Sequence, residues 1–142
     1  MPYEFLSIDD SDSTDFRLAN RFLKQAKQAT AGKTDRLFWI KNQTFPVGAL
    51  WLRPVDDGYW LRSLYIAPSY RHQGLATGLL RHTIQCLEKG QVIAFARPEL
   101  TTLYHIIGFE EIHAESLPHL LQQKLAQYQR HQPRLRCFRY DI

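Results

Sequence analysis

The chain has 142 residues, of which 44% are hydrophobic and 13% aromatic, and this size and composition predict one compact domain with a sizeable core. Its longest nearly apolar run, residues 45–52, is well short of the roughly 18 residues that a membrane-spanning helix needs. Lysine and arginine number 18 against 14 acidic residues, and this net charge of +4, spread along the chain, argues against a dedicated nucleic-acid-binding protein.

The N-terminal residues have neither a basic start nor an apolar stretch, so we expect no signal peptide and a cytoplasmic protein. The two cysteines, Cys86 and Cys137, show neither metal-ligand nor redox-motif spacing. We therefore expect both thiols to be reduced and the protein to hold no metal.

The first half of the chain starts with a strand pattern and a helix pattern. Residues 3–8 are typical of a strand, and apolar residues then recur at helical spacing from Phe16 to Ala29, which predicts an amphipathic helix up to Gly32. The acidic, hydroxyl-rich stretch 9–14 can cap this helix. The next three strands form a predicted antiparallel meander with short turns, at residues 36–41, 45–53 and 59–67.

The second half begins with a helix pattern that starts at Thr77 and ends near Lys89 and Gly90. A continuously apolar strand at 92–96 follows, so the order strand, helix, strand predicts one parallel pairing in an otherwise antiparallel sheet. The remaining predicted elements are a helix at 99–107, a strand at 108–114, a helix at 117–128 and a strand at 135–142. The fold class is therefore α/β (α+β), with one domain over residues 1–142 and a mixed, mostly antiparallel sheet flanked by helices.

The loop before the helix at Thr77 has the residue types of a phosphate site. Backbone N–H groups at a helix N-terminus bind phosphate oxygens, Gly74 permits a close approach, and the forked donors of Arg71 match phosphate geometry. A plain connection with a glycine in its turn is the alternative. The chain contains neither G-x-x-x-x-G-K-[ST] nor G-x-G-x-x-G, which excludes the two common nucleotide-phosphate motifs.

Residues 66–76, "IAPSYRHQGLA", resemble the acetyl-CoA-binding motif of the GNAT family of N-acetyltransferases, V/I-x-P-x-[YF]-R-x-x-G-[ILV]-[GA] between a strand and a helix. Tyr104, Gly108 and Phe109 match the Y-x-x-x-G-F signature of the same family, and the order of elements agrees along nearly the whole chain. The resemblance implies an acetyl-CoA-dependent N-acetyltransferase. It would transfer an acetyl group to a primary amine of a small molecule or peptide by direct attack in a ternary complex.

The resemblance also assigns residues to acetyl-CoA and to catalysis. The strand that would pair with the pantetheine arm through its backbone contains Leu64, Tyr65 and Ile66. The stretch that would hold the pyrophosphate contains Arg71, His72, Gln73, Gly74, Leu75, Ala76 and Thr77. The side chains of His72 and Gln73 can equally face solvent. Tyr104 matches the acid that protonates the departing thiolate, and a half-buried phenol in a structural hydrogen bond is the alternative.

No general base can be assigned from the sequence. Many relatives have a glutamate on the strand before the loop, where this chain has Arg62 and Ser63. The acids nearby in sequence fit a turn or a helix start better than a base, namely Asp56, Asp57 and Glu99. Arg97 stands where relatives often have asparagine, and it either reaches an anionic part of a ligand or lies on the surface.

Two functions and two assemblies stay open at this point. The alternative to an enzyme is a non-catalytic acyl-CoA-binding sensor or partner-binding module. The sequence is compatible with a monomer or a homodimer, and we expect neither a membrane nor a nucleic acid as partner. The identity of the acceptor amine does not follow from the residues.

Overall fold

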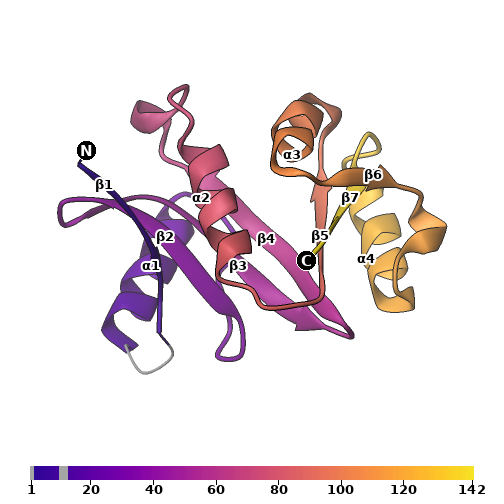
Figure 1. Ribbon diagram of the computed structural model, residues 1–142, viewed down its shortest axis with the longest axis horizontal. Coiled ribbons are helices and arrows are strands. Elements are labelled where there is room, and N and C mark those ends of the chain that lie inside the picture. The colour runs from indigo at the N-terminus through magenta and orange to yellow at the C-terminus, as the bar shows by residue number, and fades with distance from the viewer. Residues whose placement is uncertain (1, 10–12) are drawn as a thin grey trace. The chain divides into compact units, whose positions relative to one another are not determined.

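The computed structural model describes residues 2–9 and 13–142, and in these residues it has seven strands, four α-helices and three short 3-10 helices (Figure 1). The strands form one mixed sheet in the order β1-β2-β3-β4-β5-β7-β6. The predicted α/β fold, with a mixed sheet flanked by helices, is confirmed. No helix in the described part of the chain is long and apolar enough to cross a membrane.

The helices and strands follow the predicted order. The strands are β1 (Tyr3–Ser7), β2 (Arg36–Asn42), β3 (Phe45–Val55), β4 (Gly58–Ile66), β5 (Gln91–Ala96), β6 (Glu110–Ile112) and β7 (Arg136–Asp141). The α-helices are α1 (Ser13–Gln25), α2 (Leu75–Gln85), α3 (Thr101–Ile107) and α4 (His119–Gln129). The 3-10 helices are η1 (Pro68–Tyr70), η2 (Pro98–Leu100) and η3 (Ala114–Ser116). The cap expected at 9–14 includes residues 10–12, which lie outside the described residues.

Helix α1 ends at Gln25, so the predicted end at Gly32 is wrong. Lys27 has a left-handed backbone with φ of 60°, its N–H bonds to the Lys24 carbonyl, and the Gln28 N–H bonds to the Leu23 carbonyl. These two bonds are the Schellman pattern that closes a helix, here with lysine in the position that glycine usually takes. Residues 26–35 therefore form a non-helical segment, although their alanines continue the helical spacing.

Helix α2 begins at Leu75 and ends at Gln85, two residues before the predicted start and four before the predicted end. Its last turn is tightened: the Cys86 N–H is shared between the His82 carbonyl at 3.2 Å and the Thr83 carbonyl, three residues back, at 3.1 Å. Leu87 is still buried, so the apolar spacing that suggested a longer helix reflects packing beyond the helix end.

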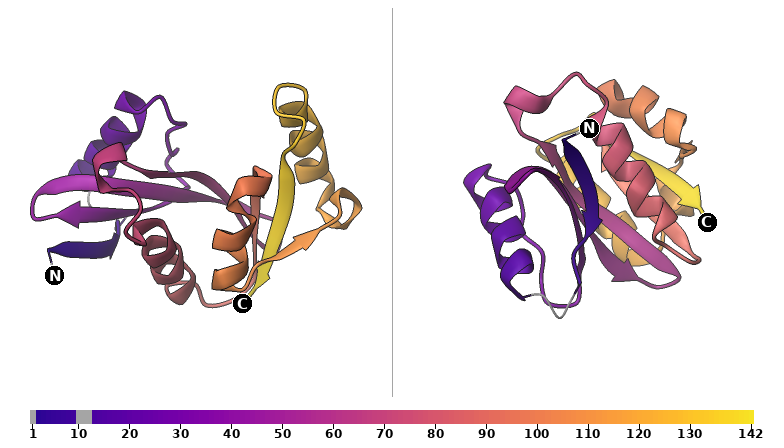
Figure 2. Two further views of the ribbon diagram at one scale, coloured as in Figure 1. Left: turned by 90° about the horizontal axis from the view of Figure 1, so that it is seen from above. Right: turned by 60° about the vertical axis from the view of Figure 1, so that its left-hand side comes forward.

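The chain divides into two compact units, an N-terminal unit of residues 1–54 and 61–88 and a C-terminal unit of residues 55–60 and 89–142. In the N-terminal unit, α1 and α2 cover opposite faces of β1, β2 and β3 (Figure 2). Leu37 and Trp39 pack in the core cluster that includes Leu23 of α1, whereas the Phe38 ring lies 6.5 Å from the His82 ring of α2. This alternation along β2 is the two-residue period of a strand buried on both faces.

The C-terminal unit is built on β7, which pairs antiparallel with both β5 and β6. Cys137 and the α4 residues Leu121 and Leu125 belong to one core cluster. Phe138, the next residue of β7, instead stacks on Tyr104 of α3. Both cysteines of the chain are free thiols, as expected.

Candidate functional site

The C-terminal end of β4 carries the stretch predicted to meet the pantetheine arm. Leu64 and Tyr65 are partly exposed, and Ile66 is buried. Gly48 of β3 makes room for this end of β4, because a Cβ on Gly48 would lie 2.6 Å from Ile66 Cδ1 and 3.2 Å from the Tyr65 carbonyl oxygen. The last contact with β3 is the bond from the Ala67 N–H to the Val47 carbonyl at 2.8 Å, after which the chain turns through η1 into the loop.

Arg71 joins the end of β4 to the loop. Its Nε donates to the Ile66 carbonyl at 2.7 Å, and its guanidinium carbon lies 5.4 Å from the centroid of the Tyr65 ring. The structure thus joins the strand residues 64–66, predicted to meet the pantetheine arm, to the loop residues from 71 onward, predicted to hold the pyrophosphate. Both sets lie in the N-terminal unit.

Gly74 is the N-cap of α2 and has a left-handed backbone with φ of 79° and ψ of 13°. The first intrahelical bond of α2 runs from the Gly78 N–H to the Gly74 carbonyl at 3.0 Å, so the N–H groups of Leu75, Ala76 and Thr77 have no partner within the helix. Within residues 2–9 and 13–142, no side chain caps them. A Cβ on Gly74 would meet nothing within 4 Å, so the helix mouth is open to a ligand.

The two variable positions of the loop differ in the structure. His72 is exposed and has a positive φ of 66°. Gln73 is also exposed, but its side chain is held by the protein: Oε1 accepts from the Tyr3 hydroxyl at 3.2 Å, and Nε2 donates to the Tyr70 carbonyl at 3.0 Å. The Tyr3 and Tyr70 rings meet edge to face at 6.3 Å. The Gln73 side chain therefore anchors the loop to β1.

Tyr104 lies on α3 in the C-terminal unit. Its side chain is 3% exposed, so it is more deeply buried than expected. The ring stacks on Phe138 at 5.2 Å with an interplanar angle of 15°, and it meets Phe109 edge to face at 5.2 Å. This burial raises the pKa of the Tyr104 phenol above its ordinary value, since the charged form would lose its hydration.

The acids considered as bases lie in an exposed turn and in exposed ion pairs. Asp56 and Asp57 are exposed in the turn between β3 and β4. Glu99 pairs with Arg134 at 3.1 Å and with Arg97 at 3.9 Å, and all three side chains are more than half exposed. Arg97 is therefore a surface residue in an ion pair. No group of three or more His, Cys, Asp or Glu side chains within residues 2–9 and 13–142 is placed to hold a metal ion.

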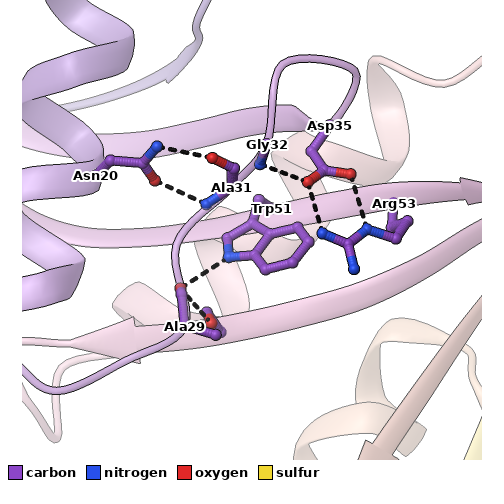
Figure 3. Close-up of polar contacts among 8 residues, drawn as sticks. Asn20, Ala29, Ala31, Gly32, Asp35, Trp51 and Arg53 are labelled. Carbon is purple, nitrogen blue, oxygen red and sulfur yellow. Dashed lines mark hydrogen bonds and ion pairs between the residues drawn. The ribbon is translucent and has the colours of Figure 1, made fainter. Parts of the chain in front are cut away.

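We call residues 26–35 the clamped segment. The sequence did not predict this segment, because the helical spacing of its alanines extended the predicted helix over it. The Asn20 side chain brackets Ala31, accepting from its N–H at 2.8 Å and donating to its carbonyl at 2.9 Å (Figure 3). The Ala29 carbonyl accepts two further bonds, from Trp51 Nε1 at 3.0 Å and from the Ser63 hydroxyl at 2.8 Å. Side chains of α1, β3 and β4 thus hold this backbone.

An ion pair between a buried carboxylate and a half-exposed arginine closes the clamped segment. Asp35 is 2% exposed and pairs with Arg53 through two bonds, Nε to Oδ1 at 3.1 Å and Nη2 to Oδ2 at 3.0 Å (Figure 3). Asp35 Oδ2 also accepts from the Gly32 N–H at 2.6 Å. The Arg53 guanidinium lies 4.8 Å from the centroid of Trp51. The two side chains of this pair are 18 positions apart in the sequence, so no local sequence pattern predicts it.

Comparison with known protein families finds a family model that matches more than half of the chain. The family model described as "Acetyltransferase (GNAT) domain" matches residues 33–111. No curated protein sequence matches the chain.

Solved structures similar to the chain include acetyltransferases. The ribosomal-protein-S18-alanine N-acetyltransferase from Escherichia coli is 18% identical with a TM-score of 0.67, over 99% of this chain and 94% of that chain. A GNAT family acetyltransferase from Elizabethkingia anophelis, solved with acetyl-CoA bound, is 11% identical with a TM-score of 0.63, over 99% of both chains. The N-acetylglutamate synthase from Neisseria gonorrhoeae, solved with coenzyme A and N-acetyl-glutamate, is 12% identical with a TM-score of 0.69; the match covers 99% of this chain and 35% of that chain. At these identities the likeness is one of fold.

Proposed function

The chain belongs to the GNAT family of acetyltransferases, and on that premise we propose that it transfers the acetyl group of acetyl-CoA to a primary amine of a small molecule or peptide. The observation that carries the proposal is the open N-terminus of α2. Three successive N–H groups there have no helical partner and no side-chain cap from the described part of the chain, and they lie next to a left-handed glycine and an arginine. Such a site suits the pyrophosphate of coenzyme A.

In the proposed complex, acetyl-CoA follows the order of the chain. The pyrophosphate lies against residues 71–77, where backbone N–H groups and the remaining guanidinium donors of Arg71 can meet its oxygens. The pantetheine arm lies along the backbone of Leu64, Tyr65 and Ile66. His72 and Gln73 contribute through their backbone, since the Gln73 side chain is already bonded to Tyr3 and Tyr70. Support for this placement comes from the Arg71 bond to Ile66, which ties the two stretches together.

The proposed reaction is a direct transfer in a ternary complex. The neutral acceptor amine attacks the thioester carbonyl, a carbon–nitrogen bond forms, and the carbon–sulfur bond breaks. The amine nitrogen loses one proton to solvent, and the departing thiolate gains one. In this proposal the Tyr104 phenol donates that second proton.

Burial of Tyr104 has two effects on this role. The raised pKa keeps the phenol protonated throughout the physiological range, so the donor is always loaded. It also makes the phenol a weaker acid than an ordinary tyrosine, and a thiol has an unperturbed pKa of only about 8.5. Because even a full thiolate is a weaker base than the phenolate, proton transfer from Tyr104 is uphill by itself. In this proposal it occurs during carbon–sulfur cleavage, which drives it, and solvent then returns a proton to the phenolate.

We propose an α-amine as the acceptor. At pH 7 roughly one α-amine in seven is neutral, but only about one lysine amine in 2,500, from their pKa values of about 7.8 and 10.4. The β4 positions where relatives have a glutamate are Arg62 and Ser63, so the chain has no acid there to deprotonate a lysine. Two similar structures are of enzymes named for alanine and glutamate acetylation, which agrees with this choice.

Thiol release from acetyl-CoA tests the function, measured for the wild type and for Tyr104→Phe. The acceptors are peptides with a free α-amine, N-terminally blocked peptides with lysine, and a set of small amines. We expect release with α-amines and a turnover that is lower by about 10²–10⁴ in the variant, the range for a positioned acid. Calorimetry should show nearly unchanged acetyl-CoA binding.

Other outcomes would change the assignment. Full activity of Tyr104→Phe would mean that water protonates the thiolate. Bound acetyl-CoA without release for any amine would favour a non-catalytic acyl-CoA-binding module. Because the pKa of Tyr104 is raised, the wild-type turnover should show no loss with rising pH below about pH 10, the ordinary pKa of a phenol. A basic decline near neutral pH would exclude Tyr104 as the titrating acid.

A further inference from the structure

Ser63 interrupts β4 immediately before the residues that we place along the pantetheine arm. Its φ is 59°, a left-handed conformation that residues other than glycine rarely adopt within a strand. Side chains of neighbouring strand residues normally point to opposite faces. Here the Arg62 guanidinium lies 5.3 Å from the centroid of Trp51, and the Ser63 hydroxyl bonds to the carbonyl that Trp51 also contacts. The Arg62 side chain thus lies against the Trp51 ring, and the side chain of the next residue bonds to the carbonyl oxygen that Trp51 Nε1 also bonds.

The Ser63 hydroxyl connects β4 to the clamped segment. It donates to the Ala29 carbonyl at 2.8 Å, and Trp51 Nε1 donates to the same oxygen at 3.0 Å. Ala29 cannot shift freely, because Asn20 holds Ala31 and the Asp35–Arg53 pair holds Gly32 two and three residues further on. A displacement of β4 at Ser63 would therefore pull on the Ala29 carbonyl, which belongs to a segment that Asn20 and the Asp35–Arg53 pair hold in place.

The proposed placement of acetyl-CoA suggests a role for the hydrogen bond between Ser63 and Ala29. With the pyrophosphate at residues 71–77 and the pantetheine arm along Ile66 to Leu64, the thioester reaches the Ser63 end of the stretch. An acceptor amine must approach the thioester from the surroundings of Ser63. The clamped segment belongs to those surroundings, because its Ala29 carbonyl is bonded to Ser63.

We propose that Ser63 is a positioning residue that fixes the clamped segment to the cofactor strand, so that the acceptor and the thioester are held in register. The inference rests on the proposed function for the course of the cofactor. The hydroxyl need not touch either substrate. Its loss should weaken use of the acceptor more than binding of acetyl-CoA.

Three substitutions separate this role from simple support of the backbone. Ser63→Gly relieves the left-handed strain and removes the hydroxyl, so it should fold at least as stably as the wild type. Its kcat/KM for the α-amine acceptor should fall by about 3–10-fold, as expected for one lost hydrogen bond, while the acetyl-CoA Kd changes less than about twofold. Ser63→Asn tolerates the left-handed conformation and restores a donor, so it should recover most of the loss. Ser63→Ala keeps the left-handed strain and has no donor. It should therefore be less stable than Ser63→Gly and should lose as much kcat/KM for the acceptor.

Hydrogen exchange tests the connection without any turnover. In the free protein, Ser63→Gly should speed exchange at residues 29–32 as well as at 64–66, and Ser63→Asn should restore slow exchange in both. Gln43→Gly is the matched control, because Gln43 has a φ of 59° in the turn between β2 and β3. This control should leave both stretches unchanged.

The outcomes distinguish the two proposals. Faster exchange confined to 64–66, or wild-type acceptor kinetics in Ser63→Gly, would overturn the positioning role. If the wild type neither binds acetyl-CoA nor releases thiol, the proposed function fails. The exchange result in the free protein then still decides whether Ser63 couples the two stretches.

Discussion

Two stretches of irregular backbone in the N-terminal unit use their N–H groups in opposite ways. In the clamped segment, the N–H groups of Ala31 and Gly32 are bonded by the side chains of Asn20 and Asp35. At the mouth of α2, the N–H groups of residues 75–77 have no helical partner, and no side chain among the residues that the structure describes caps them. Identical chemical groups thus stabilise the protein in one stretch and are left for a ligand in the other. The side chains that surround a loop, more than its glycines, decide which of the two it is.

Breaking the Asp35–Arg53 pair should have the largest effect. Arg53→Met leaves the buried Asp35 carboxylate without its cation, and because the Arg53 side chain is half-exposed the free energy of unfolding should fall by about 2–3 kcal/mol, less than for a fully buried pair. Urea denaturation measures this loss. The double variant Asp35→Asn with Arg53→Met is the control and should recover more than half of it, because no buried charge is left. A loss below about 1 kcal/mol for Arg53→Met would show that the pair does not hold the clamped segment.

Closing the open stretch should have the next largest effect, and on affinity instead of stability. Gly74→Glu puts a negative charge where we place the pyrophosphate, and like charges in contact cost several kcal/mol. We expect acetyl-CoA affinity to fall more than about a hundredfold by calorimetry. Gly74→Ala is the control, since it imposes the same left-handed strain without charge and its Cβ meets nothing within 4 Å. It should lose less than about tenfold. Unchanged affinity in Gly74→Glu would disprove the phosphate site.

The smallest effect is a gain of stability that sharpens the comparison. Lys27 holds a left-handed conformation at the end of α1, where glycine is favoured. Lys27→Gly should therefore raise the free energy of unfolding by up to about 1 kcal/mol, with acetyl-CoA affinity unchanged. Thermal unfolding measures the gain. Lys27→Ala keeps the strain and should give none, and a destabilised glycine variant would mean that the lysine side chain itself supports the segment.

The sequence predicted the regular parts of the fold well and the irregular parts poorly. Alternating and continuous apolar runs gave every strand, because burial on a sheet imposes those patterns. The end of α1 was missed because the alanines at 26 and 29 keep helical spacing and the residue that ends the helix is a lysine. The left-handed Ser63 gives no local signal either, and its hydroxyl bonds to Ala29, 34 residues away.

The candidate site divides in the same way. The loop at 71–77 was found from local residue types, and the structure shows the open helix mouth that they suggest. The depth of Tyr104 could not be read from its motif, because it depends on Phe138 of β7, a strand distant in sequence. The bond from Arg71 to Ile66 and the anchoring of Gln73 to Tyr3 likewise need the folded chain.

The tip of the hairpin between β3 and β4 has a consequence for how this protein can be recombined with others. Residues 55–60 belong to the C-terminal unit, where the Trp60 ring lies 5.4 Å from Phe95 and 6.2 Å from Tyr128. Each unit is therefore encoded by two separate stretches of the gene. A single crossover between homologous genes always divides at least one of the two units, and a crossover between residues 60 and 95 separates Trp60 from both of its aromatic partners. Exchange of either half as a module requires three breakpoints, two of them inside this hairpin.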